Sequence, residues 1–365
     1  MARALRHLQV GTAVASLAVL CLFLTAGSAS AAAPGVFGVD FTSATQGWAV
    51  GSDCTIARTT NGGLTWQTQF TRPGGPALLG VCVLPDGKTG WAVGAAGTVL
   101  RTNDGVTWKP VTSSVLDATV SYTSVKFVDA KTGWICGGVA AGPFQGLPRG
   151  GVWRSTDGGA TWSGPAATFP GWCPLALDAV SASRAVCAGV LRVGVGVTGC
   201  NTPALVQTTN GTSWGSSPVV LRAGFAQTAE IGDVALTGAA GAPGIVAVGD
   251  YSELLPPTPI VFAAQSGAAS LSCAAAPKTG PSQLRGVSMP TATVGYAVGS
   301  GAGALLKTTT GGATWTVLPT SLGKNLYAVD FVDAATGYAA GRNAAGTAAA
   351  VIKTTNGGVS WSAVR

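Results

Sequence analysis

The chain has 365 residues, a formal net charge of +7 and a single histidine, His7, near its start. Residues 1–31 have the pattern of a secretory signal peptide, with a basic start, an apolar run from Val10 to Ala26 and small residues up to Ala31. Cleavage there would leave a mature chain without histidine, which excludes Ser-His-Asp and Cys-His catalytic sites and imidazole metal sites. We expect a secreted or cell-envelope protein, whose leader is either cleaved or kept as an anchor.

Charge and cysteine content indicate which partners and cofactors to expect. Arg3 and Arg6 leave with the leader, so the formal charge falls to about +5, and without Lys/Arg runs nucleic acid is not an expected partner. Seven cysteines remain, and in an exported protein some of them should pair, in a connectivity that the sequence leaves open. No CxxC pair occurs, so no metal and no other cofactor are expected. No stable membrane span is expected after cleavage.

One short pattern recurs to the end of the chain, and we call each copy a box. Its fullest copy runs from Arg154 to Trp162: a Ser/Thr pair, an Asn or Asp, one or two glycines, and a hydroxyl residue before Trp. The short acceptor side chain can bond backbone N–H groups and glycine supplies a positive φ, which is typical of a hairpin turn. The other copies are Arg58–Trp66, Arg101–Trp108, Gln207–Trp214, Lys307–Trp315 and Lys353–Trp361.

Each box belongs to a longer unit of roughly 48 residues. The first unit has a short strand at Val39–Phe41, a Gly-Trp-Ala-Val-Gly strand at 47–51, a third strand into the box and a fourth strand after it. Apolar residues alternate with period two, and no stripe of helical period occurs. Insertions interrupt the third and fourth units at 140–150 and 193–198, and the fifth unit lacks a box and carries the proline-rich segment Leu255–Pro259.

Seven units of four strands predict an all-β fold, a seven-bladed β-propeller of four-stranded antiparallel blades. We expect a monomer with one closed ring over residues 32–365, in which no strand is exchanged between the first and last blades. Most tryptophans occupy two repeat positions and are expected to pack between blades, whereas Trp153 and Trp172 lie off the pattern and are expected to be more exposed. The expected blades are 36–77, 78–120, 121–173, 174–228, 229–281, 282–324 and 325–365.

The box resembles the Asp-box, or bacterial neuraminidase repeat. Together with the Gly-Trp-Ala-Val-Gly strand it resembles the photosystem II stability and assembly factor family of seven-bladed propellers, over essentially the whole mature chain. This resemblance implies a non-enzymatic protein that binds a protein client through a basic patch. The acidic position of the box is Asp only at Asp104 and Asp157, and elsewhere it is Asn61, Asn210, Thr310 or Asn356. Because Asn accepts the same turn hydrogen bonds, we interpret the box as a fold element.

The residues that match the basic patch precede the box in five units, and on a closed ring these five units are consecutive. We call this set the cationic arc; it consists of Arg58, Arg101, Arg154, Lys307 and Lys353. If the blades superpose, the five cations lie at similar radius and height and would attract an acidic protein surface. The alternative is that each cation covers carbonyls or a tryptophan of its own blade and has no partner.

Two kinds of function stay open. The first is an exported, non-catalytic scaffold that binds a protein partner; the second is an Asp-box glycoside hydrolase or a carbohydrate-binding surface protein. Hydrolysis would need two facing carboxylates, and Asp40, Asp233 and Asp330 share one first-strand position that would line the central channel. These aspartates could equally be solvated and bonded to backbone. The sialidase set of three arginines with a Tyr-Glu pair cannot be assembled, so no catalytic residue is assigned and the non-enzymatic interpretation is favoured. The sequence identifies neither the client nor any link to photosynthesis.

Overall fold

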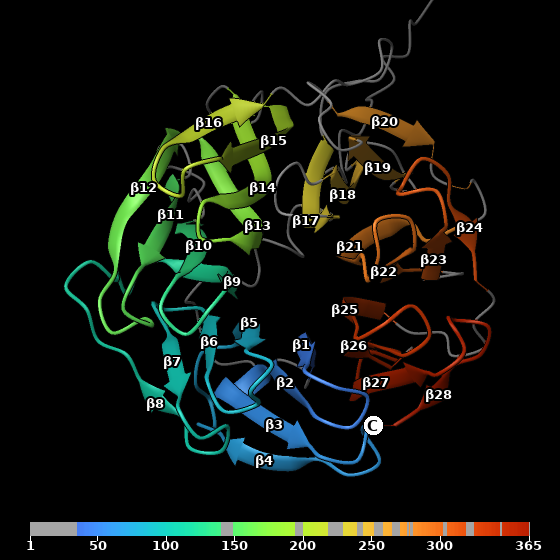
Figure 1. Ribbon diagram of the computed structural model, residues 1–365, viewed down its shortest axis with the longest axis horizontal. Coiled ribbons are helices and arrows are strands. Elements are labelled where there is room, and N and C mark those ends of the chain that lie inside the picture. Colours follow the sequence, from blue (N-terminus) through green and yellow to red (C-terminus); the bar gives the residue numbers. More distant parts are fainter. Residues whose placement is uncertain are drawn as a thin grey trace, which may run out of the picture.

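The computed structural model arranges the strands in seven antiparallel sheets around a central axis (Figure 1). It describes residues 35–139, 149–193, 200–217, 229–238, 244–251, 258–264, 271–275, 277, 280–301, 305–318, 325–343 and 345–364. The expected leader, the position of the missing fifth box, most of the insertions at 140–150 and 193–198, and residues 255–257 of the proline-rich segment lie outside these residues. No helix in the described part of the chain is both long and apolar enough to cross a membrane.

The first four blades follow each other in chain order, each running from an inner to an outer strand. Blade one contains β1 (Val36–Phe41), β2 (Gly47–Gly51), a short 3-10 turn η1 (Ser52–Cys54), β3 (Thr55–Thr59) and β4 (Gln67–Phe70). Blade two contains β5 (Leu78–Val83), β6 (Gly90–Gly94), β7 (Val99–Thr102) and β8 (Lys109–Pro110). Blade three contains β9 (Ser121–Phe127), β10 (Gly133–Val139), β11 (Arg149–Ser155) and β12 (Ser163–Pro170). Blade four contains β13 (Trp172–Ser181), β14 (Arg184–Val193), β15 (Cys200–Thr208) and β16 (Trp214–Ser217).

The last three blades complete the ring. Blade five contains β17 (Ala229–Thr237), β18 (Gly244–Tyr251), β19 (Thr258–Ala264) and β20 (Ser272–Ala275). Blade six contains β21 (Gln283–Ser288), β22 (Gly295–Ser300), β23 (Leu305–Thr308) and β24 (Thr316–Val317). Blade seven contains β25 (Asn325–Phe331), β26 (Gly337–Arg342), β27 (Ala349–Thr354) and β28 (Ser362–Ala363). The predicted seven-bladed propeller of four-stranded antiparallel blades is therefore confirmed.

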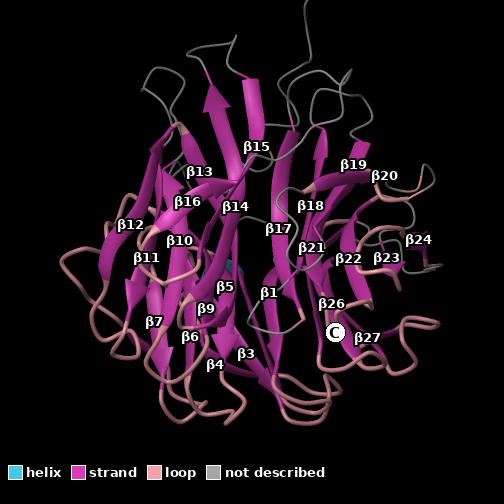
Figure 2. Ribbon diagram, turned by 45° about the horizontal axis from the view of Figure 1, so that its top comes forward, coloured by secondary structure: helices cyan, strands magenta, loops and turns pink. Residues whose placement is uncertain are grey.

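The ring closes between blades seven and one without exchange of a strand, as predicted, because β25 to β28 all pair within one sheet. At this boundary an apolar cluster joins Val36, Phe41 and Ala49 of blade one to Tyr338 and Val351 of blade seven. Figure 1 shows β1 beside β25 and β26 of the last blade, and Figure 2 shows that the described part of the ring consists almost entirely of strands and the loops that join them. Among the described residues, apolar contacts and hydrogen bonds of side chains, and no strand pairing, therefore hold the two ends of the ring together.

The second strands are buried along their whole length, which explains their glycines. A Cβ at Gly51 would collide with the carbonyl oxygen of Gly35, and one at Gly299 would collide with that of Gln283. At these positions the neighbouring inner strand approaches so closely that only glycine fits. The Gly-Trp-Ala-Val-Gly pattern is thus a consequence of crowding near the axis.

Aromatic residues form the contacts between blades. The Tyr338 ring of β26 stacks on Phe41 of the next blade with 3.4 Å between ring centroids, and Trp66 of the box meets Phe41 edge-on at 6.1 Å. The same arrangement recurs as Trp91 on Phe127 with Trp162, and as Tyr296 on Phe331 with Trp361. The prediction that the repeated tryptophans pack between blades is confirmed.

The two tryptophans off the repeat pattern are buried as well, so the prediction that they are exposed is wrong. Trp172 is 1% exposed and belongs to the cluster around Trp134. Trp153 is 5% exposed and meets Tyr122 edge-on at 5.1 Å. Trp153 belongs to the cluster that contains Trp91, Val93 and Val99, so the neighbouring blade two covers it.

Four cysteines are buried thiols that form no disulfide, so the expected pairing is not found at Cys54, Cys82, Cys136 and Cys187. Burial raises the pKa of the Cys82 thiol to about 12. Thiols in such surroundings stay protonated and behave as small apolar side chains.

Candidate functional site

The box turns engage their own polar side chains. In the first box the Thr59 hydroxyl accepts a hydrogen bond from the backbone N–H of Gly63 (2.8 Å), and the Asn61 side chain accepts one from Thr65 (2.9 Å). The hydroxyl of Thr310 replaces the Asn in the sixth box and accepts from the N–H of Thr314 (2.9 Å). Where the residue is acidic, as at Asp104, backbone N–H donors hold the pKa of the carboxyl well below its usual range. These contacts agree with the interpretation of the box as a fold element.

The cationic arc occupies one position of the strand register. Each cation is the direct cross-strand partner of the aromatic residue in the second strand of its own blade. The Arg58 guanidinium carbon lies 5.1 Å from the centroid of the Trp48 ring, and the Lys353 ammonium lies 5.2 Å from that of Tyr338. Arg154 and Lys307 lie over their aromatic partners at 5.7 and 5.4 Å. The charges are therefore displayed at one level of the ring.

The heads of several arc residues reach the next blade. Lys307 donates a hydrogen bond to the carbonyl of Gly357 (2.8 Å), and Lys353 donates one to the carbonyl of Ala44 (3.2 Å). The guanidinium of Arg154 donates to the carbonyl of Ala182 (3.4 Å), and that of Arg101 lies next to Gly158 in the following box. Part of the alternative from the sequence is thus present, since these cations cover an aromatic ring and carbonyls at blade boundaries.

The face that carries the boxes still presents charge and apolar surface. The five arc residues are half-buried, and in the described part of the chain none of them forms an ion pair with a carboxylate. The tips of three consecutive boxes expose Val359 (73%), Leu64 (76%) and Val106 (49%). A hollow of about 400 Å³ lies beside Arg101. Unpaired positive charge next to exposed apolar side chains suits a protein partner with acidic and apolar residues.

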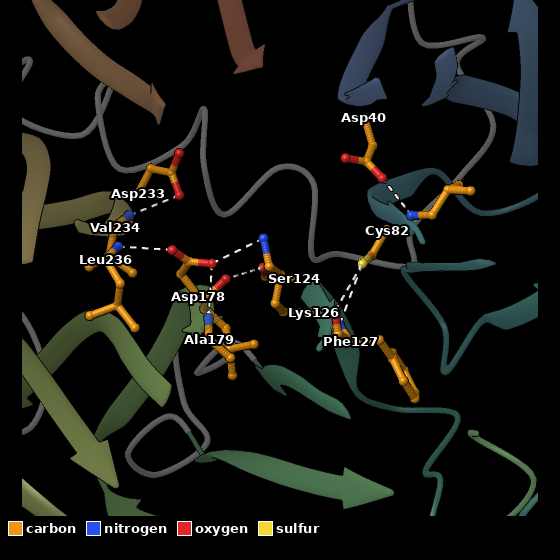
Figure 3. A network of polar contacts seen from close by, with 12 residues as sticks. Asp40, Cys82, Ser124, Lys126, Phe127, Asp178, Ala179, Asp233, Val234 and Leu236 are labelled. Atoms are coloured by element: carbon orange, nitrogen blue, oxygen red, sulfur yellow. Dashed lines mark hydrogen bonds and ion pairs between the residues drawn. The ribbon is translucent and has the colours of Figure 1, made fainter. Parts of the chain in front are cut away.

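A second set of polar residues lines the central channel, one from each inner strand, and we call it the channel ring. Figure 3 shows its members Asp40, Cys82, Lys126, Asp178 and Asp233. The channel ring consists of Asp40, Cys82, Lys126, Asp178, Asp233, Ser288 and Asp330. Most members accept a hydrogen bond from a backbone N–H of the next blade: Asp330 from Phe41 (2.7 Å), Asp40 from Val83, and Ser288 from Phe331 (3.1 Å). The channel ring thus connects each blade to its successor.

Lys126 is the member that cannot accept a hydrogen bond. Its ammonium pairs instead with Asp178 of the next blade at 3.2 Å, while Lys126 remains 41% exposed to the channel. The charge of Asp178 is the largest cause that raises the pKa of Lys126. Asp178 itself accepts from the N–H of Leu236 (2.8 Å). Sequence reasoning missed both residues, although Asp178 stands between apolar neighbours as Asp40 does.

Asp40, Asp233 and Asp330 were expected at one equivalent position of the inner strands, and two of the three lie there. Asp40 pairs with Trp48, and Asp330 pairs with Tyr338 at the equivalent place. The prediction is wrong for Asp233, which lies opposite Val248, two residues earlier in the strand register. Ala235, which pairs with Val246, takes the expected position.

Asp233 keeps the same kind of contact with the next blade, although it lies two residues earlier in its strand. Asp233 accepts from the N–H of Val287 in the next blade (2.8 Å). Burial is the main cause that raises the pKa of Asp233 to about 7 and that of Asp330 to about 7. The nearby charge of Asp40 raises the pKa of Asp330 further. These carboxylates are engaged with the backbone of neighbouring blades, as one of the two interpretations of the sequence expects.

Comparisons with known proteins give a fold and no family. Neither a protein-family model nor a curated protein matches the sequence. The fold is similar to a solved structure of YCF48 bound to D1 peptide, with 16% identity, a TM-score of 0.61, and 89% of this chain and 94% of that chain covered. It is also similar to YCF48 from Cyanidioschyzon merolae (14% identity, TM-score 0.59, 89% and 97% covered). The WD40 propeller domain of Doa1 matches with 9% identity, a TM-score of 0.55, and 89% and 90% covered.

Proposed function

We propose that the protein is an exported, non-catalytic propeller scaffold that binds a protein partner on its box face through the cationic arc. The observation that carries this proposal is the arc itself, five half-buried cations at one register position of which none meets a carboxylate in the described part of the chain. Support comes from the similar fold of YCF48, one structure of which contains a D1 peptide.

The exposed apolar side chains and the cations of the box face indicate what the partner surface should contain. Exposed Leu64, Val106 and Val359 belong to consecutive boxes and lie on the same side of the ring as Arg58 and Lys353. An extended acidic segment with interspersed apolar residues would meet both features as it crosses blades seven, one and two. Such association is faster and tighter at low salt, because exposed charges are screened at high ionic strength.

Catalysis is the weaker alternative. A glycosidase needs one carboxyl that protonates the leaving group and a second that acts as base or nucleophile. The box acids accept N–H groups of their own turns, and Asp40 and Asp330 accept N–H groups of the next blade. No contact among the described residues favours a sugar site over a protein site.

The test separates charge from structure. In one variant Arg58, Arg101 and Arg154 become Gln, and in a matched variant they become Lys, which keeps the charge over the aromatic rings. A labelled peptide that alternates Asp and Leu serves as the probe. We expect the Gln variant to bind it about tenfold more weakly and with a flatter salt dependence, and the Lys variant to bind almost as the parent does.

Two controls make the result decisive. Arg72 is exposed at the opposite end of the ring, close to η1, so Arg72→Gln removes one charge without touching the box face. A probe with Asn in place of Asp tests the need for negative charge. Equal affinity of parent and folded Gln variant, or equal affinity for the Asn probe, would refute the arc as the site. Export is tested separately by removing residues 2–31 and locating the protein in cell fractions.

A further inference from the structure

A cavity of about 280 Å³ lies at the end of the channel away from the boxes. One side of its wall is apolar and the other side carries charged groups. Blades one, two and seven contribute the apolar side chains of Phe37, Leu79 and Tyr327, whereas blades five and six contribute Glu230, Asp250 and Arg285. Neither the box face nor the hydrogen bonds of the channel ring account for this charged group.

A shared backbone feature puts several of these side chains at the mouth. Each inner strand has a register irregularity near its start, and Phe37, Leu79, Arg285 and Tyr327 are the extra residues at that place. Such bulges redirect side chains out of the regular alternation. The repeat therefore supplies one variable position per blade around the cavity.

Among the described residues, the side chains of the acidic pair form no hydrogen bond and no ion pair. Glu230 and Asp250 are direct cross-strand partners in β17 and β18. Asp250 is 4% exposed, and its Oδ1 atom is buried without a hydrogen-bond partner. In the described part of the chain Glu230 receives no hydrogen bond either. A buried carboxylate that lacks a donor is unusual, since buried polar groups are nearly always hydrogen-bonded.

Arg285 does not neutralise the pair. Its guanidinium donates to the side-chain oxygen of Gln283 (2.6 Å) and lies 5.9 Å from the centroid of the Tyr327 ring. It forms no ion pair with Glu230 or Asp250 among the described residues, although its charge lowers the pKa of both carboxyls. Asp233 adds a third carboxylate to the wall. On this side of the cavity three carboxyl groups therefore face a single guanidinium group.

We infer that this cavity binds a primary ammonium group on a short apolar chain. The ammonium would lie between Glu230 and Asp250, where its three N–H donors and single charge match the oxygens that lack partners. The chain would lie against Phe37 and Tyr327, since such pockets combine apolar walls with a few polar groups that fix orientation. The shared chemistry is that of a free alkylamine or of a lysine side chain on another protein.

The direct test is calorimetric titration of the full-length protein with n-pentylammonium chloride near pH 8. We expect saturable binding to the parent protein, and binding at least about tenfold weaker to Asp250→Asn and to Glu230→Gln, a loss of about 1.4 kcal/mol. Asp53→Asn, at the same end of the ring but outside the cavity wall, is the matched control and should bind as the parent does. Pentanol and pentanoate probe the apolar chain without the positive charge.

Several results would overturn the inference. Equal binding of pentanol would mean an apolar pocket only, and unchanged affinity in folded Asp250→Asn would remove the carboxylate from the site. A peptide with a single lysine distinguishes the sources: competition with pentylammonium identifies a lysine side chain, and binding of the free amine alone identifies a small molecule. Because the cavity and the cationic arc lie at opposite ends of the ring, failure here leaves the proposed function untouched.

The pH dependence provides a second readout. Burial, and after it the charge of Glu230, raises the pKa of Asp250 to about 7, and burial raises the pKa of Glu230 and Asp233. An ammonium ion favours the ionised carboxylates, so binding near pH 7 should release protons to the buffer and weaken as the pH falls. Affinity independent of pH between about 5 and 8 would contradict the inference.

Discussion

Asp250→Asn should make the protein more resistant to unfolding at alkaline pH than at acid pH, relative to the parent. Burial is the first cause that raises the pKa of Asp250 from 3.8 to about 7, and the charge of Glu230 adds to it. The folded state then holds a proton that the unfolded state has lost between these two values. Stability therefore falls as the pH rises through this window, and the full penalty is present above the folded pKa.

The magnitude follows from the size of this change. Each pKa unit corresponds to about 1.4 kcal/mol, so the penalty is about 4 kcal/mol near pH 8 and about 1 kcal/mol near pH 4.5. Asp250 is 4% exposed, so solvent screening takes little away. The variant should gain about 3 kcal/mol on the parent between these two pH values, or about 4 °C in melting temperature for a ring of this size.

Urea unfolding followed by tryptophan fluorescence at both pH values measures this difference directly. Asp104→Asn is a control of opposite sign, because backbone N–H groups of the box hold the pKa of Asp104 below its usual range. That variant should lose stability at neutral pH and approach the parent in acid. Parallel curves for Asp250→Asn and the parent at all pH values would refute the reasoning on the buried carboxylate.

Two further predictions concern the contacts between blades. Tyr338→Leu removes the ring that stacks on Phe41 and should lower the free energy of unfolding by about 3 kcal/mol. Tyr338→Phe keeps the ring and loses only the hydrogen bond of the hydroxyl to Ala44, so it should lower the free energy of unfolding by about 1 kcal/mol. Urea titration measures both losses, and equal losses would contradict the role of the stack. Gly299→Ala places a methyl group on the carbonyl of Gln283 and should reduce the yield of folded protein in circular dichroism, while Gly215→Ala, with open space around it, should be neutral. A stable Gly299→Ala protein would show that the blades can move apart.

The architecture could be predicted because it depends on repetition. The Gly-Trp strand, the terminal Phe of the inner strand and the box Trp recur together, and the structure brings them into contact as Tyr338, Phe41 and Trp66 or their equivalents. Each contact is determined by residue type at a fixed spacing. Repetition of this pattern along the chain, even with incomplete copies in units four and five, therefore suffices to define the ring.

The parts that sequence reasoning missed depend on register. Asp233 looks like Asp40 in its local sequence, but the strand register places it two residues earlier, where Gly38 lies in blade one. Glu230 and Asp250 become neighbours only through the pairing of β17 with β18, and the sequence of neither strand predicts which residues face each other. The rarity of glutamate in the mature chain was the one available signal for Glu230. The cationic arc could be predicted because its residues follow the repeat. Its hydrogen bonds to carbonyl groups of the next blade depend on how the blades pack, which the sequence does not show.

Because the last blade closes the ring against the first, closure has to wait until the end of the chain has been synthesised. The hydrogen bond between the Phe41 N–H and Asp330 joins residues 289 positions apart. At about 5–20 residues per second, a ribosome needs roughly 15–60 s to cover that distance. During this interval the flank of the first blade, with Val36, Phe41 and Ala49, has no seventh blade to cover it. The first blade to be made is thus the last to be protected, and chaperones have the longest access to that flank.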